Sequence, residues 1–277
     1  MHSYIKMATD RVKGEKLMKI ATYNVWNEDK GIGGRFEQLV HEIVCADADI
    51  IALQEVTTKF EHDIRKQKTG YQYCIFNKYI DEDEGLAILS KYPVDDCIFL
   101  HEHPEYANSK AQNILFRYGT SRFSFTNVHI PWDSAREKEK QIVAIDKYIQ
   151  DQKEQADYFV LLGDFNSDIN SSVHRFLTGE QTINNEESNP NWLDIMGNYD
   201  TLHGLPLKPT LDCINNPRWK GKNTIYSPAN TDRIYILDNW KPMEFVNAEI
   251  FGTEISPNNN LSASDHYGVV VDVDFTK

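Results

Sequence analysis

Alternating apolar and polar positions, and short unbroken apolar runs, recur along this chain and are typical of β-strands. The first clear strand begins at Met18, and Gly119-Thr120 is expected to turn two later strands into a hairpin. Strands are predicted at residues 18–26, 49–56, 71–76, 85–90, 95–100, 112–118, 121–130, 158–163, 233–237, 245–250 and 268–275.

Apolar residues at helical spacing mark several of the segments between these strands. Residues 35–49 carry such a stripe, and a second helix is expected from about 57 to 68, ahead of Gly70. Ser134 and Glu137 have the spacing of a capping box that opens a third helix, and a short helix is expected at 172–177. The region 179–230 is polar and rich in Asn, Pro and Trp, and no element is predicted in it.

Strands and helices alternate in both halves of the chain, with hairpins as well as crossovers. This pattern predicts mixed sheets covered by helices, an α/β sandwich. No internal repeat, low-complexity tract or linker divides the chain, so one domain is expected over residues 18–277. Residues 1–17 are polar and are expected to form a poorly structured N-terminal extension.

Composition narrows the class of protein. Of 277 residues, 40% are hydrophobic and 26% are charged, as in ordinary globular proteins. The formal net charge of −13 would repel a polyanion unless a basic patch or a bound metal offsets it. The four cysteines are scattered, and Cys45 and Cys97 are expected to be reduced core thiols. Without a signal-peptide pattern or a run long enough to span a membrane, the sequence predicts a soluble cytoplasmic protein, and no obligate protein partner is evident.

The apolar run that ends at Gly163 is followed at once by Asp164 and Asn166. In an extended segment, residues two positions apart point to the same side, so a carboxylate and an amide would face one spot. An Asx turn that closes the strand is the alternative. Other predicted strands carry polar residues near their ends in the same way, namely Asn24, Gln54, Glu55, Asn127, His129, Asp232, Ser264, Asp265 and His266.

Together these residues suit two kinds of chemistry. Strand ends of α/β sheets often meet in one crevice, where carboxylate and amide oxygens would bind a hard cation such as Mg²⁺. Two histidines with acidic partners suit proton transfer near neutral pH. Each residue alone also has a structural explanation: a solvated side chain for Glu55, or a hydrogen-bonded core histidine for His129. The sequence has no HExxH motif, cysteine cluster or nucleophile elbow, so a zinc protease or a serine hydrolase lacks support.

Seven short motifs follow one another along the chain: TYNVWN (22–27), LQEV (53–56), EGLAILSKYP (84–93), NVHI (127–130), GDFNS (163–167), TDRIYI (231–236) and SDHYG (264–268). With these motifs the chain resembles the endonuclease/exonuclease/phosphatase superfamily, which includes DNase I, AP endonucleases, neutral sphingomyelinases and inositol polyphosphate 5-phosphatases. The motifs span nearly the whole chain from Met18. The resemblance implies a DNase I-like four-layer α/β sandwich and a Mg²⁺- or Mn²⁺-dependent hydrolysis of a phosphate ester by an activated water.

The motif positions imply which residues surround the metal. Glu55 matches the principal metal-ligating glutamate, and Asn24 matches the amide beside it. Asp265 matches an acid that orients the metal or the phosphate. Glu84 is a weaker match to a glutamate that pairs with the histidine of the NVHI motif.

The same comparison implies catalytic roles. Asp164 and Asn166 match the pair that positions the attacking water and the phosphate. His266 matches the histidine that would act with Asp164 to deprotonate this water. His129 matches a second histidine, which could donate a proton to the phosphate or the leaving group. Asp232 occupies the acid position of the TDRIYI motif, where it orients a histidine.

Substrate selection is expected to depend on the loops, chiefly 104–113 and 179–230. Aromatic side chains could stack on a base, sugar or tyrosine ring, and a basic cluster could hold a second phosphate. The candidates are Trp132, Trp192, Trp219, Tyr226, Arg218, Lys220 and Lys222. Tryptophans that anchor a long loop and lysines that keep it soluble would give the same pattern.

Three classes of function stay open at this point. The acidic net charge favours a small organic phosphate, such as a sugar phosphate, as the substrate. The DRI and SDHYG forms favour a DNA-directed nuclease or repair phosphodiesterase, although Asn230 stands where an arginine is often found and the AP-endonuclease form RIDYI is absent. A sphingomyelinase-like lipid enzyme is a variant of this second class, and no secretion signal or membrane-facing apolar hairpin supports it. A catalytically silent binding module would not need the whole polar set.

Overall fold

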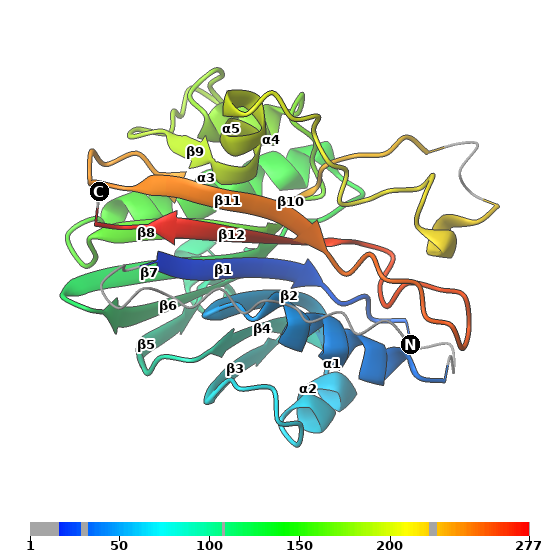
Figure 1. The fold of residues 1–277 in the computed structure, drawn as a ribbon. Helices are drawn as coiled ribbons and strands as arrows, with labels where there is room; N and C mark the ends of the chain where they lie inside the picture. The colour runs from blue at the N-terminus through cyan, green and yellow to red at the C-terminus, as the bar shows by residue number, and fades with distance from the viewer. Residues whose placement is uncertain (1–16, 29–32, 107–108, 222–225, 277) are drawn as a thin grey trace.

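The strands form two mixed sheets that pack face to face (Figure 1). The computed structural model describes residues 17–28, 33–106, 109–221 and 226–276, and within them each sheet has six strands. Sheet A has the order β11 (Glu244–Phe251), β12 (Gly268–Asp274), β1 (Leu17–Asn24), β2 (Ile50–Thr57), β4 (Glu84–Ser90) and β3 (Tyr73–Lys78). Sheet B has the order β5 (Val94–Phe99), β6 (Ala111–Tyr118), β7 (Ser121–His129), β8 (Tyr158–Asp164), β10 (Asp232–Leu237) and β9 (Trp192–Asp194).

A parallel pair lies at the centre of each sheet, and a helix connects its strands. In sheet A, α1 (Arg35–Ala46) joins β1 to β2, and in sheet B, α3 (Ala135–Asp151) joins β7 to β8. The other helical segments are α2 (Thr58–Ile64), α4 (Ser172–Leu177), α5 (Ile195–Leu202), η1 (Leu100–Glu102), η2 (Pro104–Tyr106) and η3 (Pro217–Trp219).

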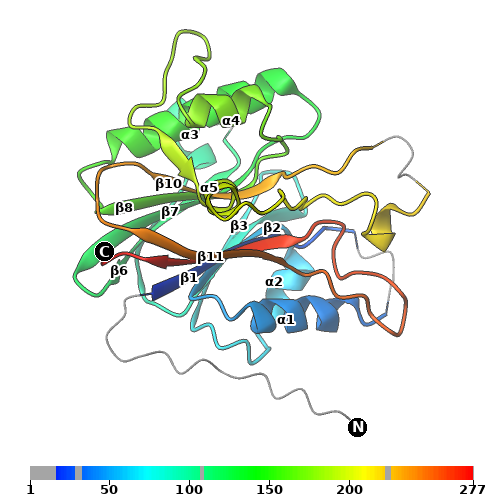
Figure 2. The same ribbon diagram turned by 45° about the horizontal axis from the view of Figure 1, so that its top comes forward.

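Four layers result, as Figure 2 shows from α3 and α4 at the top, through the two sheets, to α1 and α2 at the bottom. Apolar side chains fill the space between the sheets and the space under each helix pair. Every residue of β8 is buried, which explains why its sequence is an unbroken apolar run instead of an alternating one. The predicted four-layer α/β sandwich is confirmed.

Several local predictions are also confirmed. Tyr118 pairs with Ser121 across the two-residue turn of the β6–β7 hairpin. The Ser134 side chain caps α3, since its hydroxyl accepts from the Glu137 N–H at 3.3 Å. The predicted helix 57–68 is shorter and ends at Ile64, because the polar residues 65–68 are exposed and have no apolar face to bury.

The polar region 179–230 holds more structure than its composition predicted. It contains β9, α5 and η3. Asp194 caps α5 by accepting from the Gly197 N–H at 3.1 Å, and Ile195 and Met196 are buried against the strands. A few apolar residues in an Asn-rich context were therefore enough to fix a helix.

Two expectations concern the surface and the termini. β1 begins at Leu17, and the predicted extension otherwise lies outside the described residues. Cys45 is exposed on α1 and is not a core thiol, because the buried stripe of that helix passes through Leu39 and Ile43 instead.

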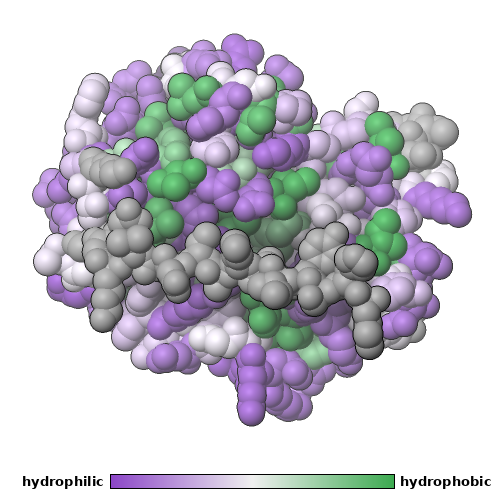
Figure 3. All heavy atoms as spheres, viewed as in Figure 1, coloured by the Kyte–Doolittle hydropathy of each residue, from purple (hydrophilic) through white to green (hydrophobic). Residues whose placement is uncertain are grey.

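On the face seen in Figure 1, hydrophilic residues predominate and hydrophobic ones form separate groups (Figure 3). Among the described helices, none has both the length and the apolar character needed to cross a membrane.

Candidate active site

Three strands of sheet B meet at one edge with polar side chains. β7 ends at His129, β8 ends at Asp164, and β10 begins at Asp232. Asp164 pairs directly with His129 on one side and with Asp232 on the other. Paired residues share a face of the sheet, so the three side chains form a row. Their exposed fractions are 8%, 1% and 0%.

Gly163 allows β8 to approach β7 at this edge. Its φ is +143°, and a Cβ at this position would lie 2.0 Å from the carbonyl oxygen of Val128. A side chain would force the strands apart, so the close approach of β7 explains why a glycine precedes Asp164.

Asp164 makes both of the arrangements that the sequence left open. Its Oδ1 accepts from the Asn166 N–H at 2.8 Å, as in an Asx turn, and Asn166 has a φ of +46°. Its Oδ2 faces the other residues of the site. The Asn166 amide also donates to Asp164 Oδ2 at 3.3 Å and to the carbonyl oxygen of Ile130 at 2.9 Å. Asp164 and Asn166 therefore share one location.

Sheet A brings an amide and a carboxylate to the same place. Asn24 ends β1, and Glu55 lies where the β2–β4 register shifts between Leu53 and Val56. This irregularity, with a φ of +56° at Glu55, redirects the side chain at the strand end. Asn24 Nδ2 donates to Glu55 Oε1 at 3.0 Å and to Asp164 Oδ2 at 3.1 Å. One amide thus connects carboxylates from the two sheets.

The segment before β12 adds a histidine to the row of sheet B. His266 Nδ1 lies 2.9 Å from Asp232 Oδ2 and 3.9 Å from Asp164 Oδ2. Ser264 fixes this segment, because its hydroxyl donates to the carbonyl oxygen of Asn24 at 2.7 Å. The short contact to Asp232 fixes the orientation of the imidazole ring and favours a proton on Nδ1.

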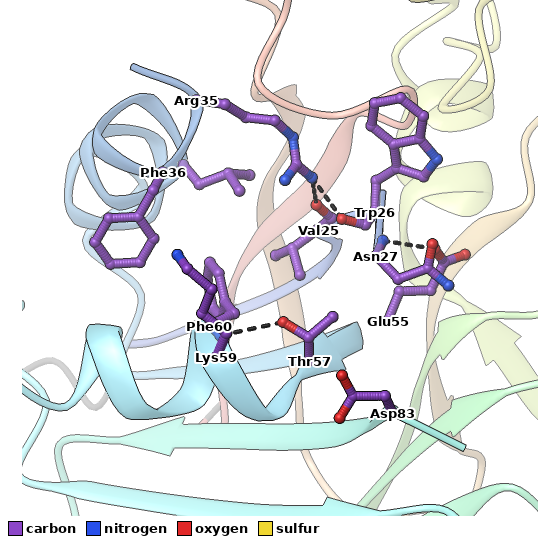
Figure 4. A pocket seen from close by; sticks show the side chains of 11 residues that line it. Val25, Trp26, Asn27, Arg35, Phe36, Glu55, Thr57, Lys59, Phe60 and Asp83 are labelled. Atoms are coloured by element: carbon purple, nitrogen blue, oxygen red, sulfur yellow. Dashed lines mark hydrogen bonds between the residues drawn. The ribbon is translucent and has the colours of Figure 1, made fainter. Parts of the chain in front are cut away.

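His129 lies beside both carboxylates. Its Nε2 is 3.8 Å from Glu55 Oε1 and 3.9 Å from Asp164 Oδ2. Within the described part of the chain, its enclosed Nδ1 has no hydrogen-bond partner, so the expected pairing with Glu84 is not formed. Glu84 accepts instead from the side-chain amide of Asn27. Asn27 also donates its backbone N–H to Glu55 Oε2 at 2.9 Å (Figure 4), and therefore occupies the position between these two acids.

Two carboxyls of the site have pKa values shifted in opposite directions. Burial, followed by the neighbouring charge of Asp232, raises the pKa of Asp164 to about 6. Burial also acts to raise the pKa of Glu55, but nearby His129 and the hydrogen bonds from Asn24 and Asn27 outweigh it and lower this pKa. Glu55 is therefore a fixed anion near neutral pH, whereas Asp164 is able to exchange a proton there.

The pKa of His266 is raised well above its usual value. Burial acts to lower this pKa, but the charges of Asp232 and Asp164 and the hydrogen bond to Asp232 outweigh burial. The imidazole therefore carries a positive charge near neutral pH.

The oxygen donors on the Glu55 side fit a hard divalent cation. Glu55 keeps 17% of its side chain exposed. Burial raises the pKa of Asp265, and the charge of Glu55 raises it further, so two acids repel each other where a cation would neutralise both. Asn24 Oδ1 already accepts from the Trp26 N–H at 2.9 Å, which makes Asn24 a residue that orients Glu55 before it is a ligand.

A second group of ligand-type atoms is formed by Asp164, Asp232 and His266, which lie within 4.8 Å of one another. The hydrogen bond between His266 and Asp232 accounts for this proximity without an ion. The two groups make different predictions for metal binding, which mutation can separate.

Trp192 does not reach the site, and its expected role in substrate binding is wrong. β9 pairs with β10, and Trp192 is 1% exposed in the core under α3 and α4. Its Nε1 donates to Asp146 Oδ1 at 2.7 Å. In contrast, Trp132 is 77% exposed just after β7, and Lys220 is exposed after η3. Lys222 lies outside the described residues.

The short helix η3 borders the site. Trp219 Nε1 donates to the carbonyl oxygen of Asp265 at 3.0 Å, and the Trp219 ring contacts Tyr226 edge-on. The guanidinium of Arg218 lies 5.2 Å from the ring centre of Trp26.

Two supporting residues, Asn27 and Lys138, were not singled out from the sequence. Asn27 lies in the TYNVWN motif, so its position was a signal, but its two partners are distant in sequence. Lys138 on α3 donates to the carbonyl oxygen of Asn166 at 2.5 Å, and nothing in the sequence indicates this contact. Gln54 Nε2 donates to Asn127 Oδ1 at 2.8 Å, so these two strand-end amides join the sheets beneath the site.

A pocket opens beside Glu55 between α1 and α2 (Figure 4). Apolar side chains form much of its wall, and it shares Glu55 and Asn27 with the site. Its lining includes Val25, Phe36, Leu39, Phe60, Asn27, Glu55, Thr57, Lys59 and Asp83. Space is therefore available next to the carboxylates for the part of a substrate that is not phosphate.

Two packed six-stranded mixed sheets, with helices on both outer faces and an acid–histidine site at their shared edge, define a DNase I-like phosphoesterase fold. The sequence matches the model of the Endonuclease/Exonuclease/phosphatase family over residues 21–266, and the chain belongs to this family.

Individual similar proteins differ in what they act on. The chain is 27% identical over 227 residues, 68% of its length, to a probable CCR4-Not complex 3'-5'-exoribonuclease subunit Ccr4 of Vairimorpha ceranae. It is 25% identical over 256 residues, 80% of its length, to an inositol phosphosphingolipids phospholipase C of Saccharomyces cerevisiae. The chain spans about half the length of these curated relatives, 48% and 51%. A structure of D. rerio TDP2 complexed with single strand DNA product has a TM-score of 0.73, with 16% identity and coverage of 93% of this chain and 99% of that one.

Proposed function

We propose that this chain is a metal-dependent phosphoesterase that hydrolyses a small organic phosphate, such as a sugar phosphate. The carrying observation is that Asn24 contacts a carboxylate from each sheet, Glu55 and Asp164, within 3.1 Å. A cation-binding group and a proton-transfer group thereby face one volume, as hydrolysis of a phosphate ester requires.

We assign the cation to the Glu55 side, with Asp265 as the second acid and Mg²⁺ or Mn²⁺ as the ion. When bound, such an ion would neutralise charge on the phosphate oxygens. Asn24 and the backbone N–H of Asn27 hold the Glu55 carboxylate in place through its two oxygens.

Asp164 is the proposed proton acceptor for the attacking water, and Asn166 orients the water or a phosphate oxygen. His266 is held by Asp232 and brings positive charge towards the phosphate as negative charge develops. His129 is positioned to donate a proton to the leaving oxygen. General acid–base assistance of this kind contributes on the order of 10² to 10⁴ in rate.

The net charge of −13 supports a small substrate, because a polyanion would be repelled. A nucleic acid is the second candidate, supported by the Ccr4 relative and by Trp132, whose exposed ring follows β7 in the chain and could stack on a base. A cytoplasmic location is part of the proposal and is supported by Cys74, Cys97 and Cys213, none of which forms a disulfide within the described residues.

Phosphate release from a substrate panel tests the proposal. The panel contains sugar phosphates, nucleotides, a generic phosphodiester, plasmid DNA, a short RNA and a sphingolipid-type phosphodiester, each with Mg²⁺, Mn²⁺ or EDTA. Phosphatase-coupled detection reports cleavage of the diesters. EDTA-sensitive release from small monoesters with intact nucleic acid is the expected result. Cleavage of nucleic acid without release from the monoesters would make nucleic acid the substrate in place of a small phosphate. Turnover unaffected by EDTA would contradict the metal dependence.

A further inference from the structure

Arg218 lies next to the proposed site although its segment is outside the seven motifs. Its guanidinium is 5.2 Å from the ring centre of Trp26. The backbone N–H of Trp26 holds Asn24, the residue that orients Glu55. The next residue of η3, Trp219, is bonded to the Asp265 carbonyl. Arg218 therefore borders the cation side of the site.

Trp26 is held in a fixed position for this contact. It has a φ of +58°, a left-handed conformation that is uncommon for a bulky residue and is found where the surroundings impose it. Arg35 lies 5.3 Å from the same ring and donates to the carbonyl oxygens of Val25 and Trp26. In Figure 4 the indole points away from Phe36 and Phe60. The ring thus provides a platform beside the apolar pocket.

The charge of Arg218 is only partly satisfied. Its Nε donates to the carbonyl oxygen of Ser262 at 2.8 Å, while the enclosed Nη2 has no hydrogen-bond partner. Among the described residues no carboxylate forms an ion pair with Arg218. Burial and the nearby charge of Arg35 lower the pKa of Arg218, and the charge of Asp265 offsets them only in part. An enclosed guanidinium N–H without an acceptor is costly, and an arriving anion would supply the missing hydrogen bond.

We propose that Arg218, stacked on Trp26, binds a second phosphate group of the substrate, separate from the ester that is hydrolysed. This inference rests on the proposed function. Among the described residues, Arg218 contacts Trp26 and Ser262 and makes no hydrogen bond or ion pair with Asp164, Asp232 or His266, so we place this anion beside the scissile phosphate and not at it. A guanidinium fork is suited to two oxygens of one phosphate. The substrate class is therefore a small bisphosphate.

The test compares a sugar bisphosphate with the matched sugar monophosphate in the presence of Mg²⁺. The measured quantity is the ratio of the two kcat/KM values for the full chain and for Arg218→Gln, Arg218→Lys and Arg117→Gln. Arg117 is an exposed residue of β6 that pairs with Asp95 and serves as the matched control. Thermal unfolding of each variant monitors the fold.

We expect Arg218→Gln to lower this ratio about 10- to 100-fold, mainly through KM for the bisphosphate. Arg218→Lys should retain part of the preference, and Arg117→Gln should retain all of it. An equal loss on both substrates, or no loss, would overturn the inference. A selective loss on a short oligonucleotide, with the sugar pair unchanged, would also overturn it in favour of a nucleic acid. If the unmutated chain releases no phosphate from either substrate, the proposed function itself fails.

Discussion

Each of the two sheets contributes a carboxylate to the site, and these carboxylates differ in their burial and in their neighbours. On sheet B, Asp164 and Asp232 are 1% and 0% exposed and lie beside histidines. On sheet A, the Glu55 side chain is 17% exposed and accepts hydrogen bonds from Asn24 and Asn27. The pKa of Asp164 is raised to about 6, largely by burial, whereas the pKa of Glu55 is lowered.

Environment, and not residue type, gives these two carboxylates different roles. A carboxylate that stays anionic suits a cation, and one that titrates near neutrality suits proton transfer. Asn24 touches both, so the two functions are adjacent but separable. Mutations on the sheet A side should therefore impair metal binding, and mutations on the sheet B side should impair turnover.

The largest effect is expected from the sheet B side. His266→Asn removes the cationic ring while an amide remains near Asp232, and we expect kcat to fall about 10³-fold. Metal binding should persist, because Glu55 is unchanged. The exposed His62 on α2 provides the control His62→Asn, which should behave as the unmutated chain in steady-state kinetics.

Glu55→Gln tests the sheet A side. Loss of the anionic oxygens should weaken Mg²⁺ binding by on the order of 100-fold, with activity lost in proportion at limiting metal. Calorimetric titration measures the affinity. The exposed Glu105 on η2 gives the control Glu105→Gln. An affinity equal to that of the control would remove Glu55 from the cation site.

The raised pKa of Asp164 predicts a pH dependence of activity. The free enzyme should lose kcat/KM as the pH falls through about 6, approaching tenfold per pH unit, because protonated Asp164 cannot accept a proton from water. A profile that stays flat down to pH 5 would contradict the role of Asp164.

The raised pKa of Asp164 also predicts how the stability of the fold changes with pH. Its pKa is higher in the folded than in the unfolded chain, so its contribution to folding is fully present below the unfolded value near 4 and is lost as the pH rises through about 6. Asp164→Asn should therefore stabilise the metal-free chain at pH 7, by on the order of 1 kcal/mol, and much less at pH 4. Denaturant unfolding in EDTA at both pH values measures it.

The smallest effect on activity is expected beneath the site. Asn127 Nδ2 donates to the Leu53 carbonyl, and its Oδ1 accepts from Gln54, so Asn127→Ala leaves buried groups of sheet A unpaired. We expect a loss of about 1–3 kcal/mol in the free energy of unfolding and a several-fold loss of kcat. Asn113→Ala is the matched control, since among the described residues the Asn113 side chain bonds only to groups of β7, within sheet B. It should lose stability without losing activity.

The architecture and the motif-bearing strand ends were readable from sequence because they depend on local patterns. The unbroken apolar run before Gly163 predicted a strand, and the Gly119-Thr120 pair predicted a hairpin. The seven ordered motifs marked Asn24, Glu55 and Asp164, residues that the register of two sheets then brings together.

The remaining features depend on contacts between distant segments. Trp192 lies in a region whose composition is typical of a loop. Its place in the core follows only from the pairing of β9 with β10. Glu84 accepts from Asn27, a residue beyond the end of β1, and not from His129. The contact of Lys138 with Asn166 depends on how α3 sits on its sheet. No spacing rule encodes such contacts.

Mg²⁺ binding by His266→Asn and Glu55→Gln, measured side by side by calorimetry, shows whether the cation site and the proton-transfer group lie on different sheets. The division between the sheets predicts that His266→Asn binds Mg²⁺ as the unmutated chain does and lacks turnover, while Glu55→Gln loses both. If His266→Asn loses the metal and Glu55→Gln keeps it, the cation belongs to Asp164, Asp232 and His266, and the assignment of the two sides is reversed.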